Sequence, residues 1–168
     1  MKYVEREYKV LEIDVDKVTQ TLEKLGAKKV FAGERIRTTF DFIDSSISAK
    51  NDELRLTEED KLKLSYESMT EDGEITSVKV YVSRKGETVD LLAKLGIHPV
   101  AQIKCYRISY ELDGVDYDLD TFKGIPAFLE IGLEDSDKEI NEVLELLGLS
   151  DKEIVQMSTR ELEARYKS

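Results

Sequence analysis

The sequence predicts an antiparallel α+β fold, and three observations support that prediction. Apolar and ionic residues alternate with a period of two in many separate segments, which is typical of amphipathic strands. Apolar residues recur at helical spacing in the segments between and after them. A sequence motif also returns 70 positions later, so we expect two related halves, each built from strand, helix and strand.

The first expected strand covers residues 3–13, where apolar Val4, Tyr8 and Val10 alternate with ionic residues. Each later strand also carries one ionic face. These strands are expected near residues 35–42, 53–57, 61–67, 77–82, 101–112, 115–121 and 127–133.

Four helices are expected. Asp14 is a suitable N-cap for the first, and apolar residues recur at helical spacing from Val18 until Gly26 provides a stop. The others are expected at residues 87–95, 136–147 and 152–166.

The internal repeat is carried by the motif Leu-x-Lys-Leu-Gly-x-x-x-Val, which begins at Leu22 and again at Leu92. The same shift of 70 positions relates Arg37 to Arg107, and it relates the acidic Asp41 to the acidic Glu111. We therefore expect matching ionic positions in the two halves.

Composition excludes several classes of protein. A length of 168 residues predicts a single domain, and a net charge of −11 argues against general nucleic-acid binding. No apolar run approaches the ~20 residues of a membrane span, and the start of the sequence has no hydrophobic signal segment. Cys105 is the only cysteine, which excludes an intrachain disulfide. We expect a cytoplasmic protein with no membrane or nucleic-acid partner.

The ionic strand faces leave two arrangements open. The sheet could be open, with its ionic face in water. Alternatively, about eight strands could close into a barrel around a charged interior, with the helices outside. Buried charges of both signs need a compensating guest. Carboxylates suit Mg²⁺ or Mn²⁺ and guanidinium groups suit phosphate, so the closed arrangement favours a pocket for a metal and a polyphosphate.

A family resemblance rests on motifs along the whole chain. The first is Glu5-Arg6-Glu7-Tyr8-Lys9, in which a period of two places both carboxylates and the ammonium group on one face. The further motifs are Arg37-Thr38-Thr39-Phe40-Asp41, Glu53-Leu54-Arg55-Leu56, Lys63-Leu64-Ser65-Tyr66, Tyr117-Asp118-Leu119-Asp120 and Phe128-Leu129-Glu130-Ile131. In this order they resemble the CYTH domain family, also called triphosphate tunnel metalloenzymes. It includes class IV adenylate cyclases, thiamine triphosphatases and inorganic triphosphatases.

The resemblance implies a single CYTH-like domain over residues 1–168, folded as an eight-stranded antiparallel closed tunnel barrel with flanking helices. It implies a metal-dependent enzyme that hydrolyses an inorganic or organic triphosphate, or that converts ATP to cyclic AMP and pyrophosphate. The implied substrates are tripolyphosphate, ATP or thiamine triphosphate, and a homodimer is possible.

The resemblance also assigns site residues, matched position by position. The implied ligands of Mg²⁺ or Mn²⁺ are Glu5, Glu7, Asp120 and Glu130. The implied substrate-binding residues are Lys9, Arg37, Arg55, Lys63 and Arg107, of which Lys9 and Arg107 are also assigned to catalysis. The residues alone leave open that the arginines instead form ion pairs with Glu53, Glu111 or Asp118.

Four positions depart from the family pattern. Glu67 replaces an expected cation, Gly132 an expected carboxylate, Cys105 a frequent basic residue, and Lys79 a frequent acidic one. We expect Glu67 and Lys79 to form an ion pair with exchanged polarity. The departures also support an alternative, a catalytically weakened tunnel that binds nucleotide or polyphosphate. A third possibility is a structural barrel whose charges pair with one another.

Overall fold

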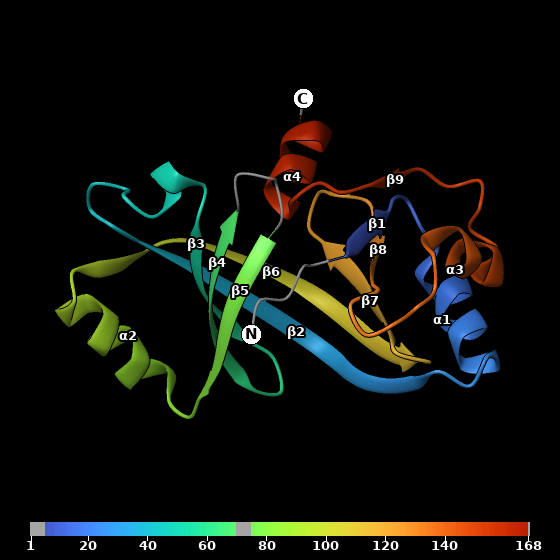
Figure 1. Ribbon diagram of the computed structural model, residues 1–168, viewed down its shortest axis with the longest axis horizontal. Helices are drawn as coiled ribbons and strands as arrows, with labels where there is room; N and C mark the ends of the chain where they lie inside the picture. Colours follow the sequence, from blue (N-terminus) through green and yellow to red (C-terminus); the bar gives the residue numbers. More distant parts are fainter. Residues whose placement is uncertain (1–5, 70–74, 168) are drawn as a thin grey trace. The chain divides into compact units, whose positions relative to one another are not determined.

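The computed structural model describes residues 6–69 and 75–167. Within these residues the chain forms nine strands and four α-helices, and every strand pairing given below is antiparallel (Figure 1). The predicted α+β class is confirmed. Glu5, which the family resemblance assigns to a metal, lies outside the described residues.

The predicted strands are all present, and some are longer than predicted. The first is shorter, because β1 ends at Val10 instead of residue 13. Their bounds are β1 Glu7–Val10, β2 Lys28–Phe42, β3 Glu53–Glu58, β4 Leu62–Met69, β5 Ile75–Val82, β6 Ile97–Leu112, β7 Val115–Phe122, β8 Phe128–Gly132 and β9 Ile154–Val155. In the described part of the chain they form one sheet in the order β5-β4-β3-β2-β6-β7-β8-β1-β9. Closure of this sheet into a barrel stays a prediction.

The helices are α1 Val15–Lys24, α2 Lys85–Lys94, α3 Ile140–Leu147 and α4 Thr159–Lys167. The predicted cap of α1 is confirmed, because the Asp14 side chain accepts a hydrogen bond of 3.0 Å from the Lys17 N–H. None of the described helices combines the length and the hydropathy that a membrane span requires.

Two helix predictions were wrong at their starts. The third helix begins at residue 140 instead of 136, because Glu139 and Glu142 form a reciprocal capping box there. The last helix begins at residue 159 instead of 152. The segment before it contains β9, which pairs with β1, and Ser158 and Glu161 then cap α4 through reciprocal hydrogen bonds.

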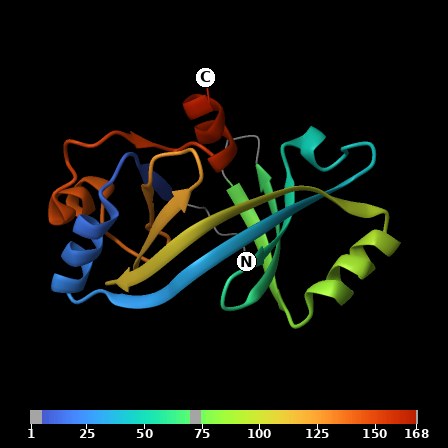
Figure 2. The same cartoon turned by 180° about the vertical axis from the view of Figure 1, so that it is seen from behind.

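The described residues divide into two compact units. Unit 1 comprises residues 34–104, and unit 2 comprises residues 6–33 and 105–167. The two long strands β2 and β6, visible from both sides in Figures 1 and 2, contribute to both units. Both bounds of α2 lie 70 positions after those of α1 (85 − 15 and 94 − 24), as the internal repeat predicts.

Each unit has its own hydrophobic core on the apolar side of its strands. In unit 2, side chains of α1 and α3 such as Leu22 and Val143, both 0% exposed, pack with Leu129 and Ile131 of β8. In unit 1, Leu92 of α2 packs against Leu56 of β3 in a smaller cluster. Burial of each such side chain contributes about 1.5–3 kcal/mol. Because strand residues alternate, the ionic side chains are left on the opposite face.

Candidate functional site: two ionic sheet faces

The strands of unit 1 present what we call the cationic face. Register aligns Arg37 of β2 with Thr57 of β3 and Lys63 of β4, and aligns Arg55 with Ser65 and Lys79 in the next row. Its charged members in the described residues are Arg35, Arg37, Arg55, Lys61, Lys63, Lys79, Asp41, Glu53, Glu59 and Glu67. Six cations therefore share this face with four carboxylates.

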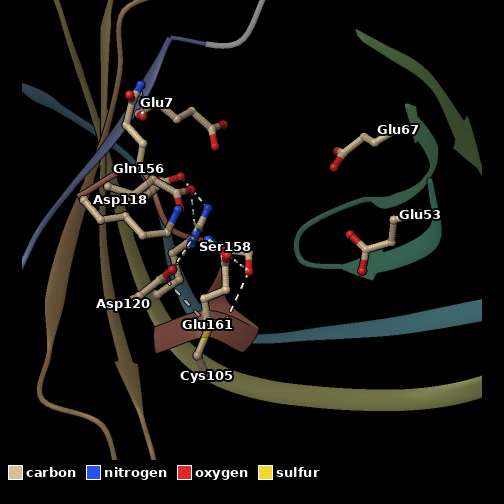
Figure 3. Close-up of polar contacts among 12 residues, drawn as sticks. Glu7, Glu53, Glu67, Cys105, Asp118, Asp120, Gln156, Ser158 and Glu161 are labelled. Carbon is tan, nitrogen blue, oxygen red and sulfur yellow. Dashed lines mark hydrogen bonds and ion pairs between the residues drawn. The ribbon is translucent and has the colours of Figure 1, made fainter. Parts of the chain in front are cut away.

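Arg55 lies between two of these carboxylates, which Figure 3 shows on β3 and β4. Its Nη1 is 3.2 Å from Glu53 Oε2, and its Nη2 donates to Glu67 Oε1. Burial would raise the pKa of Glu53, but the charges of Arg37 and Arg55 more than offset this effect and lower it. The carboxyl group is therefore held in its charged form.

Positive charge on this face is only partly compensated. Burial lowers the pKa of the Lys63 ammonium, and Arg35, Lys79 and Arg55 lower it further, whereas Glu59 opposes the change. The hydroxyl groups of Thr57 and Ser65, each 1% exposed, have no hydrogen-bond partner among the described residues. Excess positive charge together with buried hydroxyl donors favours binding of an anion with several oxygens.

The predicted Glu67–Lys79 ion pair stays a prediction. Glu67 lies opposite Ser77, and Lys79 lies opposite Ser65, so the two residues are one step apart diagonally on neighbouring strands. The partner that the structure does show for Glu67 is Arg55 on the strand at its other side. Glu67, which stands where the family pattern has a cation, therefore binds an arginine.

The strands of unit 2 present the second face, which we call the acidic face. One register row crosses four strands and aligns Ser109, Asp118, Glu130 and Lys9. Lys9 is buried, and its Nζ is 2.9 Å from Glu130 Oε2. Charged members in the described residues of these strands are Glu7, Lys9, Arg107, Glu111, Asp116, Asp118, Asp120 and Glu130; Figure 3 labels Glu7, Asp118 and Asp120. This set has six carboxylates and two cations.

Arg107 is the centre of this face. Its guanidinium binds both oxygens of Asp120, with Nε 2.6 Å from Oδ1 and Nη2 donating to Oδ2. Nη1 donates to Asp118, and Nη2 also lies 3.3 Å from Glu130 Oε1. Burial alone would lower the pKa of Arg107, but the charges of Asp120 and Asp118 raise it instead. The arginine is therefore an ion-pair partner of Asp118, one of the alternatives that the sequence leaves open.

Two carboxylates of unit 2 have roles that sequence reasoning missed. Asp118 was recognised only as a possible ion-pair partner, yet burial raises its pKa and it binds both Arg107 and Ser109. Glu134 follows β8 and lies over Gly132, where an added Cβ would be 2.8 Å from Glu134 Oε2. The other oxygen of Glu134 accepts from the Arg6 N–H at 3.0 Å. The glycine thus makes room for a carboxylate from outside the strand.

The other departure on this face is Cys105. It is buried, as expected for a small filler, and its Sγ lies 3.7 Å from Asp120 Oδ1. Lys104 does not replace the missing basic residue, because it is exposed and lies 3.5 Å from Glu34 on the opposite side of β6. Asp120 therefore has a weak sulfur donor where family members often have a cation.

The acidic face has the right donors for a hard divalent cation but not the right arrangement. Carboxylate oxygens are what Mg²⁺ and Mn²⁺ prefer. In the described residues, however, no group of three or more Asp, Glu, His or Cys side chains is placed to hold a metal ion. Both oxygens of Asp120 bind Arg107, and those of Glu130 bind Lys9 and Arg107. As they lie, these carboxylates do not fit a metal.

The fold and its two differently charged strand faces define a class of antiparallel α+β proteins whose strands each carry one ionic side. The family model of the CYTH domain matches residues 1–166, so the chain belongs to the CYTH domain family. A Methanocaldococcus jannaschii protein described as a candidate adenylate cyclase is 27% identical over 171 residues, which cover 95% of this chain and 98% of that protein.

Solved structures show the same fold. A candidate adenylate cyclase from Vibrio parahaemolyticus matches with a TM-score of 0.81 at 14% identity, covering 98% of this chain and 99% of that one. A candidate adenylyl cyclase from Hippeastrum, described as having a dominant triphosphatase activity, matches with a TM-score of 0.68. It is 14% identical, and the match covers 98% of this chain and 96% of that one.

Proposed function

We propose that the protein is a metal-dependent enzyme that acts on triphosphate-containing substrates. The observation that carries the proposal is the cationic face, where six cations share one side of the sheet with four carboxylates among the described residues. The unpartnered hydroxyls of Thr57 and Ser65 add donors to that surface. A chain of phosphate groups supplies the negative charge and the acceptor oxygens that this surface lacks.

In this proposal Arg37, Arg55 and Lys63 bind the phosphate oxygens. Guanidinium groups bind phosphate with two parallel hydrogen bonds, and lysine adds a point charge. Charge on the phosphate oxygens changes as the bond to the leaving group breaks. Fixed cations at those oxygens stabilise the transition state without reorganising.

Glu5, Glu7, Asp120 and Glu130 remain our proposed ligands for Mg²⁺ or Mn²⁺, and Lys9 and Arg107 the proposed catalytic cations. Family membership supports these assignments. In the structure, Asp120 binds Arg107, and Glu130 binds both Lys9 and Arg107. We also retain a cytoplasmic location and a homodimer as parts of the proposal that rest on the sequence.

The reaction is proposed to be hydrolysis. Water is the nucleophile in hydrolysis, whereas cyclisation of ATP requires an oriented adenosine whose ribose 3′-hydroxyl attacks the α-phosphate. The description of the Hippeastrum protein as predominantly a triphosphatase supports this choice. The M. jannaschii relative, described as a candidate adenylate cyclase, keeps cyclisation as the second reaction to test.

The test is release of phosphate and pyrophosphate from tripolyphosphate, ATP and thiamine triphosphate with Mg²⁺ or Mn²⁺. The Glu5→Gln/Glu7→Gln protein serves as the comparison because it keeps the side-chain volume and removes two charges. We expect turnover that the double variant loses, with the product identifying the reaction. Equal turnover in both proteins would contradict the metal assignment.

A second candidate is a binding protein that holds nucleotide or polyphosphate without turning it over. It is favoured by the engagement of two arginines, Arg55 with Glu53 and Glu67, and Arg107 with the acidic residues around it. Tripolyphosphate that raises the Tm with no turnover on any substrate would support this candidate. If tripolyphosphate does not bind at all, the charges serve only the fold.

A further inference from the structure

The carboxylates of the acidic face converge on a cation that the protein itself supplies. Asp120 and Arg107 are 1% and 5% exposed, so their two-point contact is shielded from water. Asp118 accepts from Nη1 of the same guanidinium, and Glu130 Oε1 lies 3.3 Å from its Nη2. Three carboxylates from two strands thus surround one positive group, as ligands surround a metal ion.

These contacts compete directly with a metal. Asp120 uses both oxygens for Arg107, Asp118 shares its oxygens between Arg107 and Ser109, and Glu130 divides its oxygens between Lys9 and Arg107. A divalent cation among these carboxylates would lie close to the guanidinium, and the two positive charges would repel each other strongly at low dielectric. The metal and Arg107 therefore exclude each other from this position.

We propose that Arg107 is a built-in substitute for the divalent cation, which binds these carboxylates tightly only after Arg107 has been displaced. This proposal rests on the triphosphate function proposed above. The group that displaces Arg107 is then a phosphate group of the substrate. A phosphate group offers the guanidinium an alternative two-point anionic partner. The three carboxylates then need a new cation, because buried charges left without a partner are costly.

Binding of metal and of triphosphate is therefore coupled. Each ligand raises the affinity for the other by the same factor, since coupling between two binding equilibria is reciprocal. Without triphosphate the protein keeps Arg107 in place and binds metal weakly. This arrangement restricts the metal-loaded state to the protein that already holds its substrate.

The test uses the metal alone, with no phosphate compound present. Mn²⁺ is titrated into the wild-type and Arg107→Met proteins, and free Mn²⁺ is followed by its electron paramagnetic resonance signal. We expect Arg107→Met to bind Mn²⁺ at least ~10-fold more tightly than wild type. Its Tm, lowered in the absence of metal, should rise with Mn²⁺ much more than the wild-type Tm does.

Arg35→Met is the matched control. Arg35 is also buried and also bound to a carboxylate, with its Nε 2.7 Å from Glu59, but it lies on the cationic face. This variant should gain no Mn²⁺ affinity, so a gain confined to Arg107→Met supports the proposal. An equal gain in both variants would show a general effect of lost positive charge and would overturn it.

Two further outcomes overturn the proposal. Wild-type protein that binds Mn²⁺ as tightly as Arg107→Met does would show that Arg107 does not exclude the metal. Absence of tight binding in both would show that the carboxylates do not form a metal site.

Should Arg107→Met fail to fold, Arg107→Lys keeps the charge but loses the two-point contact. Tighter Mn²⁺ binding by that variant is then the supporting result, and unchanged binding is the contradicting one.

Because no substrate is present, this result is separate from the proposed function. Turnover of triphosphates together with tight Mn²⁺ binding by the free wild-type protein would support the proposed function. It would contradict the proposal that Arg107 excludes the metal. A gain of Mn²⁺ affinity in Arg107→Met, with no triphosphate binding or turnover, would support the proposal that Arg107 takes the place of the metal. The same result would contradict the proposed triphosphate function.

Discussion

Arg37 and Arg107 are related by the internal repeat, yet they lie in opposite surroundings. Arg37 is aligned with Thr57, a hydroxyl residue, whereas Arg107 is aligned with Asp120 and binds it with two hydrogen bonds. The residue on the partner strand, and not the arginine itself, decides whether the guanidinium is aligned with a hydroxyl group or with a carboxylate. Two positions that the repeated motif relates thus lie on a cationic face in one unit and on an acidic face in the other.

The largest expected effect is on stability, in the acidic face. Asp120→Ala leaves the buried Arg107 without its two-point partner, so we expect the free energy of unfolding to fall by about 3–5 kcal/mol. Denaturant unfolding measures the change. The control is Glu153→Ala, which breaks the exposed pair with Arg165 and should cost about 0–1 kcal/mol. Equal losses in the two variants would contradict the buried network.

The next effect is on ligand affinity, in the cationic face. Arg37→Met removes charged hydrogen bonds worth about 1.5–3 kcal/mol, so the Kd for tripolyphosphate should rise about 10- to 100-fold in a calorimetric titration. Lys104→Met removes an equal charge from an exposed position that pairs with Glu34. It should change the Kd by less than about 2-fold, and a similar loss in both variants would indicate only general charge attraction.

Removing a carboxylate from the cationic face should have the opposite sign. Glu67→Gln relieves repulsion of a bound phosphate chain and releases one bond to Arg55, so we expect tripolyphosphate to bind about 3- to 10-fold more tightly. Glu58→Gln, on the other side of the sheet beside Lys85, is the control and should leave affinity unchanged. Weaker binding by Glu67→Gln would show that Glu67 holds Arg55 in its binding position.

The smallest effect concerns pH and Asp116, which is aligned with Gly132 and Glu111. Burial and the charges of Asp118 and Glu111 raise its pKa from 3.8 to about 6. The unfolded chain therefore loses this proton at a lower pH than the folded protein, and stability falls as pH rises from about 4 to 6.

Asp116→Asn removes that pH-dependent loss. Because the residue as a whole is exposed and burial removes only part of the water from its carboxyl group, the gain is small. We expect the Tm to rise by about 1–2 °C at pH 7.5 with no gain at pH 4. Thermal unfolding at the two pH values measures it. A gain of the same size at both values would assign the effect to something other than titration of Asp116.

Most of the fold could be predicted because strand alternation and helix caps are local signals. Asp14 and the repeat placed α1 and α2 to within two residues, since both depend on neighbouring residues. The start of α4 was missed because pairing of β9 with β1 depends on residues more than 140 positions away, at Lys9 and Val10. A helical pattern read locally cannot include that competing strand.

The candidate site was predicted in its residue types but not in its pairings. Alternation placed Lys9, Arg107, Asp120 and Glu130 on ionic faces, and the structure brings these four together. That Arg107 is surrounded by carboxylates follows from the register between β6, β7 and β8, which the sequence does not state. Glu134 was missed because it lies beyond the strand, and only the nearby Gly132 signals the space that it fills.

The most direct test of the account is a steady-state comparison of tripolyphosphate hydrolysis by the wild-type, Arg37→Met and Glu7→Gln proteins, with the Kd of each measured beside it. We propose substrate binding on the cationic face and metal-dependent chemistry on the acidic face. We therefore predict a raised Kd in Arg37→Met and, in Glu7→Gln, a lost kcat with a Kd within a few-fold of wild type. Full turnover in Glu7→Gln, or an unchanged Kd in Arg37→Met, would contradict it.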